Sequence, residues 1–386
     1  MDKQEIFQYI DNQYENMVSV LEELVRIESP SAEIEGVKKM AAHLDTYVRA
    51  MDMTTKKYEF ENAGPCLYAQ TAPTELPAVL FMGHMDTVHK IGSWENIFSI
   101  KDGIVRGPGA YDMKGGIVIA LLAIKALQHA GYNKRQFKLC LAGDEEVAHA
   151  LSKGQAIQAY KDAAKHTAVA FNCESGLVNG DIITRRKGGG VTRLKVWGKA
   201  SHAGNAPLAG ASAIMAAAKK MQQIEGLNDY EGAYFNCGKI AGGSGSNIIP
   251  DFCDVTVGIR FATNDDYVKA VENVNAIAAD NEDERIKAEY SVEAIFNAME
   301  ELPKTQVLFD LYSKAAVELG CAAPKSVYSG GCSDAAYTTM EGVPTLCGVG
   351  ILGEFNHTLQ EYALIESIKL QAKKIVATIL ALPDDF

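Results

Sequence analysis

Residues 76–87 read L-P-A-V-L-F-M-G-H-M-D-T, and this stretch decides how the rest of the chain is interpreted. Its first part is a short apolar run that favours β structure, and it ends at Gly83, where His84 and Asp86 follow. A short apolar run of this kind is typical of a strand that is buried on both faces. The stretch therefore predicts a buried strand whose carboxyl end carries two side chains capable of metal chemistry.

Helices and further buried strands alternate on both sides of this stretch. The apolar spacing predicts helices at residues 6–26, 35–51 and 115–129, and buried strands at residues 136–142, 167–171 and 343–349. This alternation predicts an α/β fold, with a mostly parallel sheet flanked by helices. In such sheets ligands gather at the carboxyl ends of the strands. The side chains that follow each strand are therefore the candidates for a functional site.

The pattern changes in the middle of the chain. From residue 188 it predicts, in order, a strand (191–197), a helix (210–224), two strands (233–240 and 252–261), a helix (265–279) and a strand (286–292). This order is the split β-α-β-β-α-β arrangement of a ferredoxin-like domain. Segments with Gly or Pro at 187–190 and 300–303 suggest hinges. We therefore predict a catalytic domain in two parts, residues 1–187 and 301–386, interrupted by a smaller domain at residues 188–300.

Composition excludes several classes of function. The chain has 386 residues and a formal net charge of −12, which argues against nucleic-acid binding because that requires basic patches. Its eight cysteines contain no C-x-x-C pair, and its first residues do not resemble a signal peptide. The apolar stretch before residue 130 contains Lys125 and is too short to span a bilayer. These features predict a cytoplasmic protein without a membrane partner.

Each candidate ligand has an ordinary structural explanation when it is taken alone. His84 and Asp86 could be a surface histidine beside a turn, and Asp112 in G-P-G-A-Y-D-M-K-G-G could cap the following helix. The D-E-E segment at 144–146 could be a charged loop. Glu174 in N-C-E-S is similarly ambiguous, and His357 in F-N-H-T could lie in an exposed loop.

Together, these segments form the ligand set of a hydrolytic metal site. Histidines and carboxylates without cysteine are typical of a catalytic rather than a structural zinc site. The Asp86 carboxylate could accept the second ring N–H of His84 and so fix its orientation. Asp112 could bridge two metals. Of the adjacent Glu145 and Glu146, one could bind metal while the other takes a proton from water.

In the order of these segments and in the inserted domain, the chain resembles the co-catalytic zinc hydrolases. This family includes glutamate carboxypeptidases, aminoacylases, acetylornithine deacetylases and succinyl-diaminopimelate desuccinylases. The resemblance covers nearly the whole chain and is most specific at residues 83–88 and 107–116. It implies two divalent metal ions, with Zn²⁺ expected and Co²⁺ or Mn²⁺ as alternatives. It also implies a homodimer formed through the inserted domain, which would also act as a lid.

The resemblance implies a role for each side chain at the metal site. Five residues would hold the two ions: His84 and Glu174 one ion, Glu146 and His357 the other, and Asp112 both. A cis peptide bond would join Asp112 to Met113. Asp86 would orient His84, and Glu145 would act as the general base and acid.

The resemblance also implies substrate contacts in the second half of the chain. His202, in K-A-S-H-A-G, would reach the active site of the partner subunit and stabilise the developing oxyanion. A structural histidine on a Gly-rich turn is the alternative. Asn247 in S-N-I-I-P and Arg260 in G-I-R-F would touch the substrate. Gly330 and Gly331, in S-G-G-C-S-D, would form a wall of the pocket.

Three departures from the family pattern are informative. Ala148 stands where a glycine often follows the paired acids, and we expect it to alter a turn but not the ligands. The R-P-P segment of glutamate carboxypeptidases is replaced by F-N-A-M at 296–299, which leaves Arg260 as the better partner for a substrate carboxylate. Glu174 stands where di- and tripeptidases usually have Asp, which favours a carboxypeptidase or a deacylase.

The sequence therefore predicts a zinc-dependent metallopeptidase or amidohydrolase. Its expected reaction is hydrolysis of an amide or peptide bond next to a free carboxylate, as in a carboxypeptidase or dipeptidase. An N-acyl-amino-acid deacylase would use the same site with different pocket walls. A metal-binding or peptide-binding protein that has lost catalysis is disfavoured, because all the ligands and Glu145 are retained.

Overall fold

The computed structural model describes residues 2–386, which separate into two compact units. Unit 1 contains the chain up to Arg185 together with Glu300–Ser329 and Ser333–Phe386. Unit 2 contains Arg186–Met299 and Gly330–Cys332. The chain thus leaves unit 1 for a long insertion and then returns to it.

Unit 1 is built on an eight-stranded mixed sheet with the order β1-β2-β6-β3-β7-β17-β9-β16. The strands are β1 (Thr54–Tyr58), β2 (Cys66–Gln70), β3 (Leu76–His84), β6 (Arg135–Ala142), β7 (Thr167–Asn172), β9 (Ile182–Arg186), β16 (Ser326–Ser329) and β17 (Thr345–Cys347). The neighbours β6, β3, β7 and β17 run parallel, whereas β1, β2 and β9 are antiparallel to their partners. The parallel strands are buried almost throughout, so β3 and β7 are largely apolar, whereas β6 also contains the buried polar residues Arg135, Gln136 and Lys138. The predicted α/β class is confirmed.

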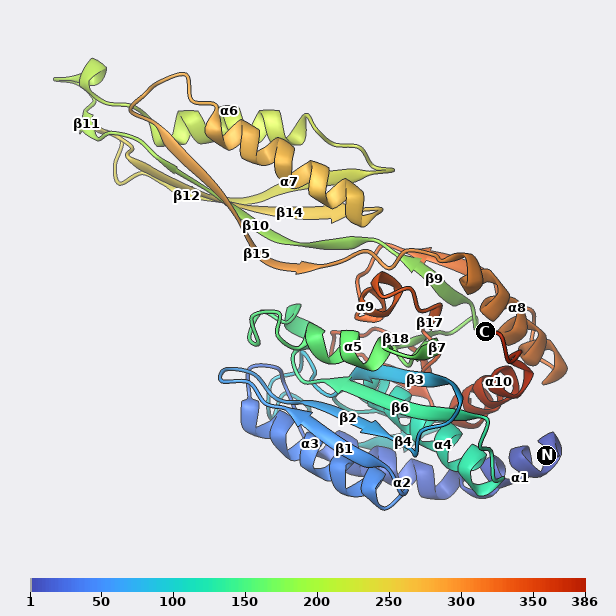
Figure 1. Cartoon of the computed structure of the whole chain (residues 1–386). Helices are drawn as coiled ribbons and strands as arrows, with labels where there is room; N and C mark the ends of the chain where they lie inside the picture. Colours follow the sequence, from blue (N-terminus) through green and yellow to red (C-terminus); the bar gives the residue numbers. More distant parts are fainter. Residues whose placement is uncertain (1) are drawn as a thin grey trace. The chain divides into compact units, whose positions relative to one another are not determined.

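Helices flank this sheet, with α3 and α5 on opposite faces (Figure 1). The helices of unit 1 are α1 (Lys3–Asn12), α2 (Tyr14–Arg26), α3 (Ile34–Arg49), α4 (Gly115–His129), α5 (Ile157–Ala164), α8 (Pro303–Glu318), α9 (Ala335–Met340) and α10 (Ser367–Ala381). The predicted helix at 6–26 is therefore two helices separated at Gln13. Helix α4 contacts β3 as well as α1, α2 and α10, which explains why its sequence is apolar on almost every side. In residues 2–386, every helix is too short or too polar to cross a lipid bilayer.

A second, five-stranded sheet in unit 1 was not predicted. Its order is β4-β5-β19-β18-β8, with β4 (Ser99–Lys101), β5 (Ile104–Arg106), β8 (Gly176–Leu177), β18 (Leu352–Glu354) and β19 (Tyr362–Leu364). Strand β8 begins two residues after Glu174, and the β18–β19 connection contains His357. Since β18 pairs with both β8 and β19, this small sheet joins two segments that carry candidate ligands.

Unit 2 has the predicted β-α-β-β-α-β order. It contains β10 (Gly188–Trp197), α6 (Ala213–Glu225), β12 (Ala233–Gly242), β14 (Phe252–Phe261), α7 (Asn264–Ala279) and β15 (Lys287–Phe296). The strands form an antiparallel sheet in the order β12-β14-β10-β15. Both helices lie on the same face of this sheet (Figure 1). Strand β14 alternates buried and half-buried residues, as expected for a sheet covered on one face.

Candidate metal centre

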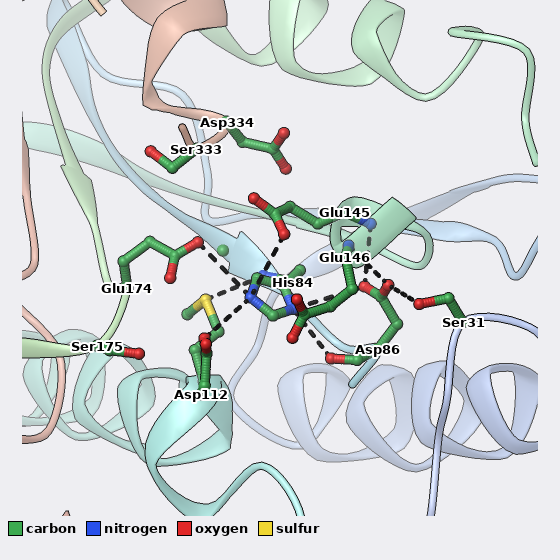
Figure 2. Close-up of polar contacts among 12 residues, drawn as sticks. Ser31, His84, Asp86, Asp112, Glu145, Glu146, Glu174, Ser175, Ser333 and Asp334 are labelled. Atoms are coloured by element: carbon green, nitrogen blue, oxygen red, sulfur yellow. Dashed lines mark hydrogen bonds and ion pairs between the residues drawn. The ribbon is translucent and has the colours of Figure 1, made fainter. Parts of the chain in front are cut away.

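The carboxyl ends of three neighbouring parallel strands bring the candidate ligands together. Strand β3 ends at His84, β6 ends three residues before Glu145, and β7 ends two residues before Glu174. Asp112 lies in the irregular turn that leads into α4, and its bond to Met113 is cis, as the resemblance implied. Figure 2 shows these carboxylates gathered around the His84 ring. The site therefore lies where the parallel sheet predicts it.

The first potential metal group contains His84, Asp112 and Glu174. His84 Nε2 lies 3.4 Å from Asp112 Oδ1 and 3.6 Å from Glu174 Oε1. All three residues are buried. Helix α4 approaches Glu174 closely because its second residue is Gly116, where a Cβ would lie 1.7 Å from Cys173 O. The backbone at Glu174 can thus pack against the start of α4 only because that position has no side chain.

The second potential metal group contains Asp112, Glu146 and His357. His357 Nε2 lies 3.2 Å from Asp112 Oδ2 and 3.1 Å from Glu146 Oε2. Asn356 Nδ2 donates a hydrogen bond of 3.1 Å to the same Asp112 oxygen. One Asp112 oxygen thus faces each group, and Asp112 belongs to both.

The donor set fits divalent metal ions. Within residues 2–386, the buried atoms Asp112 Oδ1 and Glu146 Oε1 have no hydrogen-bond donor. Leaving a buried carboxylate oxygen without a partner is costly, so these atoms indicate a missing positive ligand. Imidazole nitrogen and carboxylate oxygen are donors that suit zinc, and all six ligand atoms of the two groups are of these types.

The pKa values of the clustered side chains also indicate a site that favours cations. Burial lowers the pKa of the His84 imidazole, but the negative charges of Glu174 and Glu145 outweigh this effect and raise it well above 6.5. Hydrogen bonds to Asp112 and Glu146 raise the pKa of His357 to about 11. Burial and the nearby Asp112 charge raise the pKa of Glu146 to about 7. The carboxylates thus create a strongly negative site that favours positive charge.

Two groups of Asp86 face the Nδ1 atom of His84. Its Nδ1 donates to the backbone carbonyl of Asp86 at 2.9 Å, whereas the Asp86 carboxylate lies 3.5 Å away. A carbonyl oxygen can only accept, so Nδ1 carries the proton and Nε2 faces the metal groups. Asp86 therefore contacts His84 through its backbone carbonyl and, at a longer distance, through its carboxylate.

The Asp86 carboxylate also accepts hydrogen bonds from the turn that carries the paired acids. It accepts the backbone N–H groups of Glu145 and Glu146, each at 3.1 Å, and the Ser31 hydroxyl at 2.7 Å (Figure 2). Asp86 is completely buried, so these bonds satisfy a charge that has lost its water. Ser31 was not among the predicted site residues, because it lies 55 residues before its partner in the sequence.

Glu145 differs from its neighbour because it belongs to neither metal group. Its carboxylate lies 4.0 Å from His84 Nε2, and the residue is buried. Burial raises the pKa of Glu145 well above 4.5, and the charge of His84 only partly opposes this. A desolvated carboxylate beside a metal centre is suited to exchange a proton near neutral pH.

Glu361 supports Asp112, although no role was predicted for Glu361 from the sequence. Its Oε1 accepts the backbone N–H groups of Tyr111 and Asp112, at 3.0 and 3.3 Å. Its Oε2 lies 2.6 Å from His89 Nε2, and Glu361 is completely buried. Glu361 follows His357 by four residues, so one short segment supplies a candidate ligand and the support for another.

We expect Glu361→Ala to lower the free energy of unfolding by about 3–5 kcal/mol, since loss of the buried carboxylate leaves two backbone N–H groups and the His89 ring without their partner. The matched control is Glu354→Ala, which removes an exposed carboxylate bonded to Tyr362 Oη and should change stability by less than about 0.5 kcal/mol. Denaturant unfolding of the metal-free proteins measures both values. Equal stabilities of the two variants would show that Glu361 is not a support for Asp112.

The predicted substrate residues lie in unit 2. Ala203 N donates to Asn247 O, and the strand of His202 pairs with Ile248, so His202 and Asn247 occupy adjacent segments. His202 Nδ1 accepts the N–H groups of Gly204 and Asn205, each at 3.1 Å, so its exposed ring carries its proton on Nε2. That form can donate a hydrogen bond.

The other predicted substrate residues occupy a different part of unit 2. Arg260 lies in β14 and donates to the backbone carbonyl of Ile259 at 2.9 Å. Gly330 and Gly331 also belong to unit 2, where Arg186 Nη1 donates to the Gly331 carbonyl at 3.1 Å.

Comparisons with known proteins identify the family and the fold of the chain. Residues 80–381 match the sequence profile of peptidase family M20/M25/M40. The chain is 25% identical over 376 residues to Carboxypeptidase G2 of Pseudomonas sp. (strain RS-16), covering 94% of this chain and 88% of that protein. It is 27% identical over 359 residues to a succinyl-diaminopimelate desuccinylase of Bradyrhizobium sp. (strain BTAi1), covering 86% and 90%. A metallo-carboxypeptidase from Sulfolobus solfataricus shares the fold, with a TM-score of 0.74 at 17% identity, covering 94% and 98%.

Proposed function

The chain belongs to peptidase family M20/M25/M40, as its resemblance predicted, and we propose that it hydrolyses an amide or peptide bond next to a free carboxylate. The chain is thus a hydrolase of this peptidase family. The observation that carries the proposal is the pair of potential metal groups that share Asp112, with the buried Glu145 beside them. We also propose a cytoplasmic location, because the eight cysteines include no closely spaced pair.

The two groups would hold divalent ions, and we propose Zn²⁺ as the native metal. His84 and Glu174 would hold one ion, and Glu146 and His357 the other, with Asp112 contributing to both. When bound, such ions would supply Lewis acidity that makes water more acidic and polarises the scissile carbonyl.

The side chains of this protein would manage the protons and orient the site. Glu145 would take a proton from the attacking water and pass it to the leaving amine. The Asp86 carboxylate would accept the backbone N–H groups of Glu145 and Glu146 and so keep both residues in place. The exposed His202, with its proton on Nε2, would donate to the oxyanion of the partner subunit in a homodimer formed through unit 2. Asn247, Arg260, Gly330 and Gly331 would contact the substrate.

Two substrate classes fit this site. The replacement of R-P-P by F-N-A-M at 296–299 weakens a strict carboxypeptidase pocket, and the two named relatives differ in activity at nearly equal identity. An N-acyl-amino-acid deacylase is therefore the second candidate. Both reactions cleave an amide beside a carboxylate, for which Arg260 would be the cationic partner.

Parallel assays separate these candidates. We expect the metal-loaded protein to hydrolyse at least one member of a library of dipeptides and N-acyl amino acids that carry a free carboxylate. Amidated versions of the same compounds should lose about 1.5–3 kcal/mol of transition-state binding, because a charged hydrogen bond is absent. Chromatographic detection of the released amine measures both. Absence of hydrolysis throughout the library would reject the proposed function.

A further inference from the structure

A buried histidine lies between two carboxylates directly after the paired acids. His149 Nδ1 is 3.1 Å from Asp144 Oδ1, and Nε2 is 2.6 Å from Asp334 Oδ1. All three side chains are almost completely inaccessible to water. Carboxylate oxygens accept hydrogen bonds, so both ring nitrogens donate and the ring is an imidazolium. Burial lowers the pKa of His149, but the charge of Asp334 and the bond to Asp144 raise it well above 6.5.

The backbone at this position adopts an unfavourable conformation. Ala148 and His149 have φ values of 53° and 55°, so two consecutive non-glycine residues are left-handed. Such residues are disfavoured locally and persist only where tertiary contacts hold them. Ala148 thus adopts the left-handed conformation that glycine favours, in the turn that we expected it to alter.

The contacts of His149 close a loop around Glu145. His149 N donates to Asp144 O at 3.0 Å, and Ala148 N donates to Glu145 O at 2.7 Å. Asp144 Oδ2 accepts Ser152 N at 2.8 Å, which anchors the base of the loop. Residues 144 and 149 are thus joined through both backbone and side chains, and Glu145 lies between them.

The outer side of the His149 ring is also fixed. The Tyr160 and Tyr337 rings lie 6.3 and 5.7 Å from it, centroid to centroid. Tyr160 Oη donates at 2.6 Å to the carbonyl of Gly83, the residue before His84. Asp334 lies at the start of α9, and Figure 2 shows it near Glu145. His149 therefore contacts the turn of the paired acids directly, and the end of β3 through Tyr160.

We propose that His149 is a positioning residue for Glu145: held between Asp144 and Asp334, it keeps the left-handed turn closed and aims the Glu145 carboxylate at the metal centre. This inference rests on the proposed function to the extent that Glu145 is the base. His149 itself does not touch the reacting atoms. It acts by limiting the positions that the Glu145 carboxylate can occupy.

The test uses His149→Asn in the metal-loaded protein, because Asn tolerates a left-handed backbone but cannot bridge both carboxylates. We expect kcat to fall by about 100-fold with KM within about twofold of wild type, since a small misplacement of a catalytic group costs about this much. Asp334→Asn should give a similar loss, and the double variant should add little to it. The matched control is Leu44→Ala in α3, a fully buried truncation outside the loop that lowers stability without touching it.

Hydrogen exchange provides a readout that does not depend on activity. The amides of Glu145 and Glu146 donate to Asp86, and they should exchange faster in His149→Asn and Asp334→Asn but not in Leu44→Ala. Unchanged exchange at these two amides would overturn the proposal, as would a kcat equal to that of Leu44→Ala. If wild type hydrolyses no substrate, the proposed function fails, and the exchange data still decide the role of His149.

Discussion

Replacement of Glu145 by Gln should lower kcat by about 10³-fold and leave metal binding unchanged. Positioned proton transfer contributes about 10²–10⁴-fold to a rate, and Gln keeps the shape of Glu but cannot accept the proton. Because Glu145 belongs to neither potential metal group, its change should leave both ligand sets intact. Steady-state kinetics at saturating metal, with metal content measured by mass spectrometry, checks both statements.

The matched control for this variant is Glu22→Gln. Glu22 is exposed on α2 and pairs with Arg26 within the same helix, so its charge is remote from the chemistry of the site. Its kcat should stay within about twofold of wild type. A fully metallated Glu145→Gln enzyme with the kcat of this control would exclude Glu145 as the base.

The parallel centre of the fold was predictable because burial on both faces leaves a strong trace in the sequence. Strands β3 and β7 are largely apolar, and β6 is apolar over residues 139–142, so each was predicted to within a few residues. The five-stranded sheet left no such trace, because its strands are only two or three residues long. Yet this sheet holds the loop of His357. The sequence therefore indicated the candidate ligand but not the element that positions it.

The supports of the site depend on partners that spacing along the chain does not reveal. Glu361 contacts Tyr111 from 250 residues away, and the order of motifs does not identify such a pair. His84 was correctly associated with Asp86, but the accepting atom is a backbone carbonyl. Side-chain chemistry alone does not indicate which oxygen will accept. Candidate ligands are thus easier to predict than the contacts that orient them.

The turn after the paired acids also depends on contacts that the local sequence does not reveal. Ala148 has little tendency to adopt a positive φ, so local preference predicts an altered turn. In the structure Ala148 has a φ of 53°, and the adjacent His149 is bound on both sides by carboxylates, one of them 185 residues away in the sequence. Tertiary contacts of His149 here outweigh the local preference of these residues for a negative φ. The short segment of sequence reveals only the local preference.

Removal of metal should abolish activity and lower stability together. Asp112 Oδ1 and Glu146 Oε1 are buried without a hydrogen-bond donor in the described part of the chain, and cations would satisfy them. A ligand that binds only the folded state stabilises it by about 2.7 kcal/mol at 100 times its dissociation constant. Zn²⁺, Co²⁺ or Mn²⁺ added to the chelated protein should therefore restore hydrolysis and raise the unfolding midpoint. Full activity in a preparation shown to be metal-free would reject the metal requirement.

Asp112→Asn tests whether one residue serves both metal groups. It removes the shared charge, so metal affinity should fall at both sites, and the stabilisation by added metal should be lost. Glu174→Gln removes a ligand of the first group only and should leave the second group, which contains Glu146 and His357, able to bind. Metal titration followed by denaturant unfolding measures the number of sites that remain in each variant. If Asp112 serves both groups, Asp112→Asn should lose both sites. Loss of only one site in Asp112→Asn would show that Asp112 does not bridge the groups.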